Sequence, residues 1–357
     1  MVIEIDGSFG EGGGQILRMS LALAALVGKP IKIKNVRSRR SPPGIRPQHQ
    51  TAVKAIAAYS QAVVKGCSIG STELEYSPRK IRGGNFSFDA ETAASTSLIL
   101  QSLIPLMAFS NENSFLDLHG GTNNPWAPPI DYIQHVFLPI LSKTGFRGSL
   151  ELVRRGFYPQ GGGFIQASAE PIRRFKPIVL TKVGEIQRIS GLSYSSRLPK
   201  HIGERMARSA NVTLLNGGFK EANIRCECLQ KNDKYSAISP GCGIILIAES
   251  STGAILGSDS LGEPKKIAER VGQEAAESLV KQLKTGVPVS KHLGDQLIIY
   301  MALANGRSEI AIEELTLHTL SCIYVSKTII DANFEILGDL GRVTRIICDG
   351  IGLENAF

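Results

Sequence analysis

A run of glycines near the amino terminus constrains this chain more than any other stretch. It reads Glu11-Gly12-Gly13-Gly14-Gln15-Ile16-Leu17-Arg18, and it lies between the short apolar alternation of residues 2–5 and the apolar residues 19–26. This order predicts a strand, a tight turn and a helix, because glycine adopts backbone conformations that other residues avoid. Free N–H groups at the start of such a helix attract anions. The residues alone leave two interpretations open, a phosphate-binding turn and a plain tight turn.

The composition is that of a globular protein with an excess of positive charge. The chain has 357 residues, 43% of them hydrophobic and 20% charged, which predicts two or three domains with a substantial core. The net charge of +8 favours a polyanionic partner such as nucleic acid. No stretch is apolar enough to span a bilayer, and the chain does not start with a basic leader followed by an apolar run. We therefore expect a soluble, cytoplasmic protein.

The six cysteines are spread thinly along the chain and have neither zinc-binding nor redox-motif spacing. Cys226 and Cys228 are separated by one residue, so a strand would point both thiols to the same face. We expect the cysteines to be reduced and buried, as in a cytoplasmic protein.

A basic loop follows the predicted strand at residues 30–36. Residues 37–49 hold four arginines and three prolines, and a helix is predicted from about residue 48 to residue 64. Prolines stiffen a loop, so less ordering entropy is lost when its arginines bind phosphate in a bidentate manner. A solvated basic loop is the alternative interpretation.

The order strand, helix, strand, helix, strand, strand recurs along the chain, which predicts repeats of one unit. The second unit includes helices predicted at residues 91–109 and 128–144, and Gln101 lies in the middle of the first of them, among apolar residues. Residues 184–285 lack the glycine–arginine loops found elsewhere. The predicted α/β fold therefore has a core of residues 1–183 and 286–357, with three repeats, and a smaller inserted α/β domain of residues 184–285.

Six segments, taken together, resemble the RNA 3′-terminal phosphate cyclase family. They are residues 11–18, 43–49, 120–129, 156–163 and 293–297 and the segment around His318. Each motif alone is weak, but six in the same order along the whole chain are specific. The resemblance implies three βαβαββ repeats like the C-terminal domain of translation initiation factor three, with a smaller inserted domain. It also implies ATP-dependent conversion of an RNA 3′-terminal phosphate into a 2′,3′-cyclic phosphodiester, through enzyme-histidyl-AMP and RNA-3′-pp-5′-A, with release of AMP and pyrophosphate.

The resemblance assigns a role to each matching residue. His318 would take AMP from ATP, and histidine suits this role because its neutral form is abundant near pH 7. On sequence alone, a single histidine is more often structural. Glu11 would hold Mg²⁺ or Mn²⁺. The residues implied to clamp phosphates or RNA are Arg18, Arg37, Arg40, Arg46, Gln48 and His49. The residues implied to form the ATP pocket are Gln101, Pro128, His292, Leu293, Gly294, Asp295 and Gln296.

Position 292 departs from the family pattern, because some relatives have tyrosine where this chain has His292. Histidine can still stack on adenine, but with less contact area. RNA binding should depend on backbone charge, with the loop 37–46 and the pair Arg154-Arg155 in the groove. Aromatic residues are 6% of the chain, so an extensive base-stacking platform is not expected.

Two other functions stay open at this level. A non-catalytic, cyclase-like ribosome-assembly factor is one, and the joint presence of Glu11, Arg18, Gln48, Gln296 and His318 argues against it. An enolpyruvyl-type transferase is the other, since it shares the repeated architecture and binds phosphate with arginines, but it needs neither ATP nor a histidine nucleophile. A homodimer is compatible with the sequence, which does not determine the oligomeric state.

Overall fold

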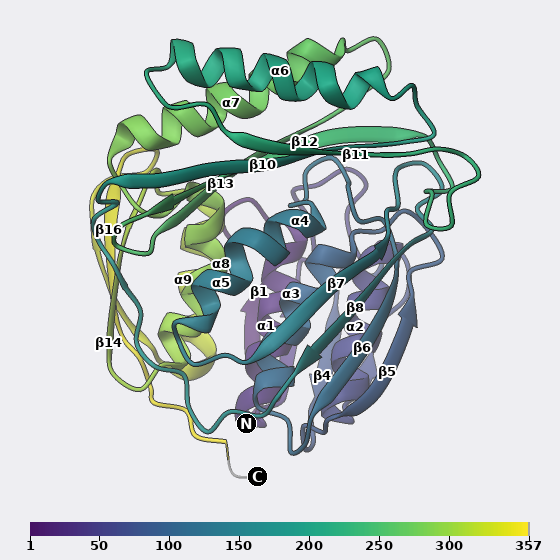
Figure 1. The fold of residues 1–357 in the computed structure, drawn as a ribbon. Coiled ribbons are helices and arrows are strands. Elements are labelled where there is room, and N and C mark those ends of the chain that lie inside the picture. Colours follow the sequence, from purple (N-terminus) through teal and green to yellow (C-terminus); the bar gives the residue numbers. More distant parts are fainter. Residues whose placement is uncertain (356–357) are drawn as a thin grey trace.

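The same βαβαββ unit occurs three times in the structure, a computed structural model that describes residues 1–355 (Figure 1). In the first copy, β1-β2-β4-β3 is the strand order, with β1 parallel to β2 and the other pairs antiparallel. Its elements are β1 (Ile3–Asp6), α1 (Gly14–Val27), β2 (Ile31–Lys34), α2 (Pro47–Ser60), β3 (Val63–Lys65) and β4 (Leu74–Ser77).

The second copy has the equivalent strand order, β5-β6-β8-β7, with the same parallel and antiparallel pairs. Its second helix is interrupted by one π-helical turn, so the single helix predicted at residues 128–144 is three consecutive pieces. The elements are β5 (Gly84–Asp89), α3 (Thr96–Ala108), β6 (Ser114–Gly120), α4 (Ile130–Tyr132), η1 (Ile133–Phe137), α5 (Leu138–Ser142), β7 (Gly148–Arg154) and β8 (Gly163–Ala169).

The third copy is split between its first strand and its first helix. Its sheet, β15-β16-β14-β9, again pairs the first two strands in parallel and the others antiparallel. The elements are β9 (Val179–Leu180), α8 (Lys291–Leu303), β14 (Arg307–Ile312), α9 (Leu317–Ile330), β15 (Asn333–Leu337) and β16 (Thr344–Asp349). The predicted fold of three repeats is therefore confirmed.

A fourth sheet, β11-β10-β12-β13, lies between β9 and α8 in the chain. Its elements are β10 (Ile186–Ser196), α6 (His201–Asn216), β11 (Asn223–Leu229), β12 (Gly241–Ser250), β13 (Ile255–Leu261) and α7 (Ala268–Thr285). Figure 1 shows α6 and α7 covering its outer face, where Met206, Val271 and Leu279 form a separate buried cluster. Ile245 and Ile247 of β12 belong to the main core instead. The separate cluster supports the proposed insert of residues 184–285, whose boundaries stay a prediction.

The main core forms because the first helix of each repeat is apolar on nearly every side, which is typical of buried helices. In α1, α3 and α8 most side chains are buried, and α1 packs against α2, α3 and α9. The helix predicted at residues 91–109 begins only at Thr96, since the Ser95 hydroxyl caps it by accepting from the Leu98 N–H at 3.3 Å.

Two predictions about individual features have different outcomes. Cys226 on β11 is exposed and Cys67, Cys228 and Cys242 are half-buried, so the expectation that the cysteines are buried holds only for Cys322 and Cys348. No helix within residues 1–355 is long and apolar enough to cross a bilayer.

Candidate active site

The glycine turn before α1 packs directly on the first turn of α9. A Cβ on Gly10, whose φ is +57°, would lie 2.4 Å from Oγ of Ser321 and 3.1 Å from the carbonyl of Leu317. Next to it, the rings of Phe9 and Tyr324 stack with centroids 4.2 Å apart. Glycine is needed here for both the backbone conformation and the close approach. The contact brings the N-termini of α1 and α9 together.

Glu11 and His318 meet at this contact, although 307 positions separate them. Oε2 of Glu11 lies 3.0 Å from Nε2 of His318 and 2.6 Å from Nη2 of Arg40. Burial lowers the pKa of His318, and so do the charges of Arg40 and Arg18, against the opposing effect of Glu11. At neutral pH His318 is therefore an uncharged imidazole in contact with the Glu11 carboxyl group. It is about one-third exposed, with a side-chain exposure of 37%, so a ligand can reach it.

A second layer of the site forms over Gly14. Arg18 of α1 and His49 of α2 both approach this glycine, and His49 is 4% exposed. Nδ1 of His49 accepts a hydrogen bond of 3.3 Å from the backbone N–H of Arg46, so its Nε2 carries the proton of the neutral ring. Burial, followed by the charges of Arg18, Arg37 and Arg46, lowers the pKa of His49 to about 3. His49 is therefore a neutral hydrogen-bond donor at physiological pH.

We expect Gly14→Ala to disturb this layer and Gly13→Ala to leave it intact. A Cβ on Gly14 would lie 2.2 Å from Nε2 of His49 and 3.1 Å from Nη1 of Arg18, so buried groups must move. A Cβ on Gly13 would meet only the Arg40 guanidinium at 3.9 Å, an ordinary contact. Denaturant unfolding should show a loss of about 1–3 kcal/mol for Gly14→Ala and little change for Gly13→Ala. Equal stabilities of the two variants would contradict this packing.

Arg18 lies in a polar cluster beneath the surface layer. Burial lowers its pKa to about 10, which still leaves the guanidinium charged at pH 7. No carboxylate of residues 1–355 lies within the 4.0 Å ion-pair distance of it. Asp295 of α8 is near, but burial raises the pKa of Asp295 to about 8, so this carboxyl is largely protonated at neutral pH. A half-buried cation without an ionised partner is a candidate site for an anion.

Two residues of this cluster, Gln15 and Cys322, were not predicted from the sequence. Nε2 of Gln15 lies 2.8 Å from Sγ of Cys322, and burial raises the pKa of this thiol well above its ordinary value. Cys322 is one helical turn after His318, so the four-residue spacing along α9 was the available signal. Cys322 also lies close enough to Arg18 for the guanidinium charge to affect its thiol.

The arginines of the basic loop divide into two groups. Arg37 braces its own loop, because its Nη1 donates to the carbonyls of Pro42 and Gly44, each at 2.9 Å. Arg39, which was not predicted, donates from Nη1 to the Gly10 carbonyl at 2.8 Å and so ties the loop to the glycine turn. Arg40 reaches Glu11 itself. The predicted residues Arg46 and Gln48 lie at the start of α2, next to His49.

The residues predicted for the ATP pocket lie on three elements, α3, α8 and the loop before α4. Nε2 of Gln101 and Oε1 of Gln296 are buried polar atoms without a hydrogen-bond partner among residues 1–355, and groups of this kind are usually satisfied by a ligand or water. The Pro128 carbonyl accepts a hydrogen bond of 2.6 Å from Ser97 of α3. The structure thus buries one amide atom of each half-buried glutamine, whereas the sequence left open a solvent-facing position for Gln101.

The other predicted pocket residues begin α8. Leu293 is fully buried in the core, so only its backbone can contact a ligand, and a Cβ on Gly294 would lie 2.9 Å from Ile312. His292 is exposed, and the partial desolvation of its ring, with the charges of Lys291 and His318, lowers its pKa. His292 is therefore close enough to His318 for their charges to interact.

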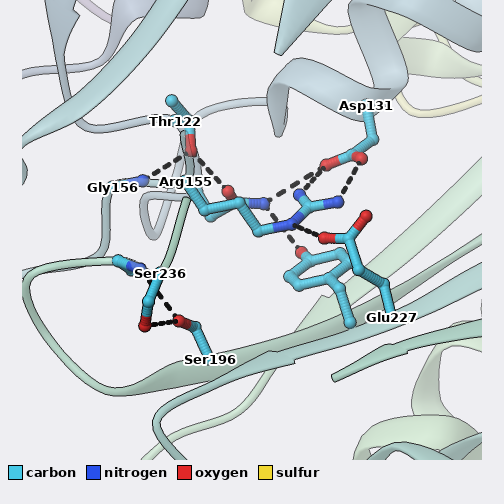
Figure 2. A network of polar contacts seen from close by, with 10 residues as sticks. Thr122, Asp131, Arg155, Gly156, Ser196, Glu227 and Ser236 are labelled. Carbon is cyan, nitrogen blue, oxygen red and sulfur yellow. Dashed lines mark hydrogen bonds and ion pairs between the residues drawn. The ribbon is translucent and has the colours of Figure 1, made fainter. Parts of the chain in front are cut away.

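Arg155 is not available for RNA, which corrects the prediction that the pair Arg154-Arg155 lines a groove. Figure 2 shows its guanidinium between Asp131 and Glu227. Its Nη1 and Nη2 lie 2.7 and 2.9 Å from the two carboxylate oxygens of Asp131, and its Nε lies 3.1 Å from Glu227 of β11. Arg155 is 4% exposed and also lies over the ring of Tyr194. It fastens the fourth sheet to the second repeat.

The donor set at Glu11 fits a metal ion that arrives with phosphates. Residues 1–355 contain no cluster of three or more metal-ligating side chains. Glu11 uses Oε2 for both Arg40 and His318, which leaves Oε1 for a cation. Mg²⁺ is commonly held by one or two carboxylates together with substrate phosphates.

The fold and the site define a three-repeat α/β protein in which a carboxylate, Glu11, joins an arginine and a neutral histidine. The family described as RNA 3′-terminal phosphate cyclase matches residues 9–336. The chain is 44% identical over 352 residues to the RNA 3′-terminal phosphate cyclase of Pyrobaculum aerophilum, which covers 99% of both chains. It is 44% identical over 355 residues to the enzyme of the same name from Staphylothermus marinus, and the alignment covers 99% of both chains. It is 42% identical over 340 residues to the one from Thermococcus kodakarensis, and the alignment covers 95% of this chain and 96% of the relative. The chain belongs to the RNA 3′-terminal phosphate cyclase family.

Among solved structures, the enolpyruvyl transferase NikO from Streptomyces tendae aligns with a TM-score of 0.27 and 8% identity, covering 98% of this chain and 65% of that one. A similarity this low supports no conclusion about fold or function.

Proposed function

We propose that this protein converts the 3′-terminal phosphate of RNA into a 2′,3′-cyclic phosphodiester at the expense of ATP. The observation that carries the proposal is the contact of Glu11 with both His318 and Arg40, in a pocket where Arg18 has no ionised partner among residues 1–355. Such a pocket has the charge to bind phosphates and a neutral nitrogen nucleophile at its rim. Family membership and the names of the relatives support the same reaction.

In the first step, a ring nitrogen of His318 would attack the α-phosphorus of ATP. The new P–N bond replaces the bond to pyrophosphate, which leaves with the bonding electron pair. The charge on the phosphate oxygens would be offset by Arg18 and Arg40, as expected for phosphoryl chemistry that depends on positioning and electrostatics. Glu11 would orient the imidazole and stabilise the positive charge that the ring gains.

In the second step, an oxygen of the RNA 3′-phosphate would attack the same phosphorus, and the P–N bond would break to release His318 and form RNA-3′-pp-5′-A. The adjacent 2′-hydroxyl would then attack the RNA phosphate, lose its proton and displace AMP. Adenylylation thus turns a poor leaving group, a phosphate oxygen, into AMP. A Mg²⁺ or Mn²⁺ ion held by Glu11 would supply further neutralisation of phosphate charge when bound.

Adenine would lie against α3 and α8 in this proposal. Gln101 and Gln296 each offer an unpaired buried polar atom, one a donor and one an acceptor, and a purine edge presents both kinds of group. His292 and Pro128 would supply apolar contact to the ring. The enolpyruvyl-transferase alternative would not use these positions.

The pH dependence of adenylylation should reflect the lowered pKa of His318. An ordinary histidine, with a pKa of 6.5, would be half protonated and half active at pH 6.5. Because the folded-state pKa is lower, we expect the rate of AMP transfer to the enzyme at pH 6.5 to exceed half of its plateau at pH 8. Arg40→Gln removes a charge that lowers this pKa, so its normalised profile should shift to higher pH. A wild-type midpoint above 6.5 would contradict the assignment.

The proposal is tested by incubating the protein with ATP labelled at the α-phosphorus, with Mg²⁺ or Mn²⁺, followed by denaturing electrophoresis. A labelled band that survives alkali and is lost in acid indicates a phosphoramidate. Conversion of a 3′-phosphorylated RNA to a phosphatase-resistant end in the same mixture tests the complete reaction. No label with either metal would refute nucleotidyl transfer and favour the assembly-factor alternative.

A further inference from the structure

Trp126 occupies an unusual position for a large aromatic residue. Its side chain is 100% exposed, and its backbone φ is +60°, a region that bulky residues rarely adopt. It lies in the loop of residues 121–129, between β6 and α4, which Asn124 fastens to the Ala93 carbonyl. The fold therefore holds this indole outward although its apolar surface is exposed to water and its backbone conformation is unfavourable. Such strain is typical of residues that bind a ligand.

A second exposed aromatic lies on the neighbouring loop. Tyr158 is 72% exposed, and the residue before it, Phe157, forms a β-bridge with Asn123 at the start of the Trp126 loop. Two arginines brace the surrounding loops: Nε of Arg154 donates to the Gly162 carbonyl at 2.7 Å, and Arg197 donates to the Ile238 carbonyl. Each guanidinium has five donors, so each keeps donors for phosphate oxygens.

The Trp126 loop leads into α4, and α4 contacts the start of α8, the helix that carries His292. The hydroxyl of Tyr132 in α4 lies 3.2 Å from Oγ of Ser290, the residue that caps α8. His292, in the first turn of α8, is in turn close enough to His318 to influence its charge. A strand whose 3′ end enters the pocket could therefore extend over this loop.

We propose that Trp126, supported by Tyr158, stacks on nucleobases close to the 3′ end of a single-stranded RNA. The inference rests on the proposed function and adds the surface that holds the strand. Exposed aromatic rings beside cations bind single strands without reading the sequence, since every base has a stacking face. Adenine of ATP is the less suitable occupant, because small-molecule pockets enclose most of their ligand whereas this indole is fully exposed. The low aromatic content restricts the platform to a few bases.

The protein carries a direct probe for the test, because Trp126 is its only tryptophan. We would titrate the full chain while recording tryptophan fluorescence. The three ligands are a short 3′-phosphorylated RNA, an RNA of the same length whose last two nucleotides are abasic, and ATP alone. The intact RNA should quench the emission, and the abasic RNA and ATP should not. Quenching by ATP, or equal quenching by the abasic strand, would overturn the proposal.

Affinities of a labelled RNA for variants provide the second measurement. Trp126→Ala should weaken binding by about 5- to 150-fold, the cost of one lost base stack, and Trp126→Phe by less. Phe115→Ala is the matched control, since Phe115 is 50% exposed but lies at the opposite end of β6 from the loop. Unchanged RNA affinity of Trp126→Ala would refute the proposal.

AMP labelling of the same variants separates this inference from the proposed function. Wild-type protein that binds RNA through Trp126 but takes no label would refute the proposed reaction and leave the RNA surface in place. A loss of ATP-dependent labelling in Trp126→Ala that matches its loss of RNA affinity would show that the indole serves the nucleotide, which would overturn the RNA assignment.

Discussion

The substitution His318→Ala should abolish covalent labelling with AMP and reduce RNA cyclisation by at least about 10⁴-fold, the scale seen when a nucleophile is removed. The reason is that His318 is the imidazole paired with Glu11, whereas His292, which is also near, has no carboxylate within ion-pair distance among residues 1–355. The nearest imidazole in the second layer, His49, is buried with its Nδ1 engaged by the Arg46 N–H, and Cys322 is a buried thiol whose pKa is raised. Labelling with α-labelled ATP and an end-conversion assay measure both losses.

A matched control is His201→Ala, since His201 is an exposed histidine at the start of α6, outside the pocket. It should label as the wild type does. An RNA that already carries AMP, RNA-3′-pp-5′-A, tests the order of steps. The His318→Ala variant should cyclise this RNA, because the final step needs no enzyme-bound AMP. Retention of AMP labelling by His318→Ala would contradict the assigned nucleophile.

Arg155→Ala should be strongly destabilising, with a loss of about 3–5 kcal/mol in the free energy of unfolding. The variant leaves the Asp131 carboxylate buried without its two guanidinium hydrogen bonds. Burial raises the pKa of Asp131, and the charge of Arg155 more than offsets this effect and keeps the pKa low. Denaturant unfolding at pH 7 gives the free energy.

The sign of the pH effect gives a second check on this ion pair. Without Arg155, the folded-state pKa of Asp131 rises above its ordinary value of 3.8, so the folded variant takes up a proton that the unfolded chain lacks. The loss should therefore be larger at pH 7 than at pH 5. Glu227→Gln is the control, because Glu227 is 43% exposed and should contribute less than about 1 kcal/mol. Asp131→Leu combined with Arg155→Met should recover most of the stability.

Much of the architecture could be predicted from local sequence. The glycine turn before α1, the repeated order of helices and strands and the break in composition after residue 183 depend on properties that each segment carries by itself, namely backbone freedom and apolar periodicity. The ends of helices were harder to predict where a capping residue or an irregular helical turn determines them. Ser95 caps the start of the helix predicted from residue 91, so that helix begins at Thr96, and a π-turn divides the helix that follows Pro129.

The site was predicted in part for a similar reason. The family resemblance pointed to Glu11, Arg40 and His318, and Glu11 lies in direct contact with each of the other two. Local sequence could not distinguish Arg154 from Arg155, although one binds a loop carbonyl and the other is buried against Asp131. The difference depends on a partner 24 positions away and on the fourth sheet.

The amino-acid sequence by itself determined the repeated unit, the turn chemistry and the residue types available for phosphate, because these follow from neighbours along the chain. Only the tertiary structure decided which charges are buried, which are paired and which stay free. It places Glu11 beside His318, leaves Arg18 without an ionised partner among residues 1–355, and turns Trp126 outward. These outcomes depend on desolvation and on contacts between segments hundreds of residues apart, and no local pattern contains them.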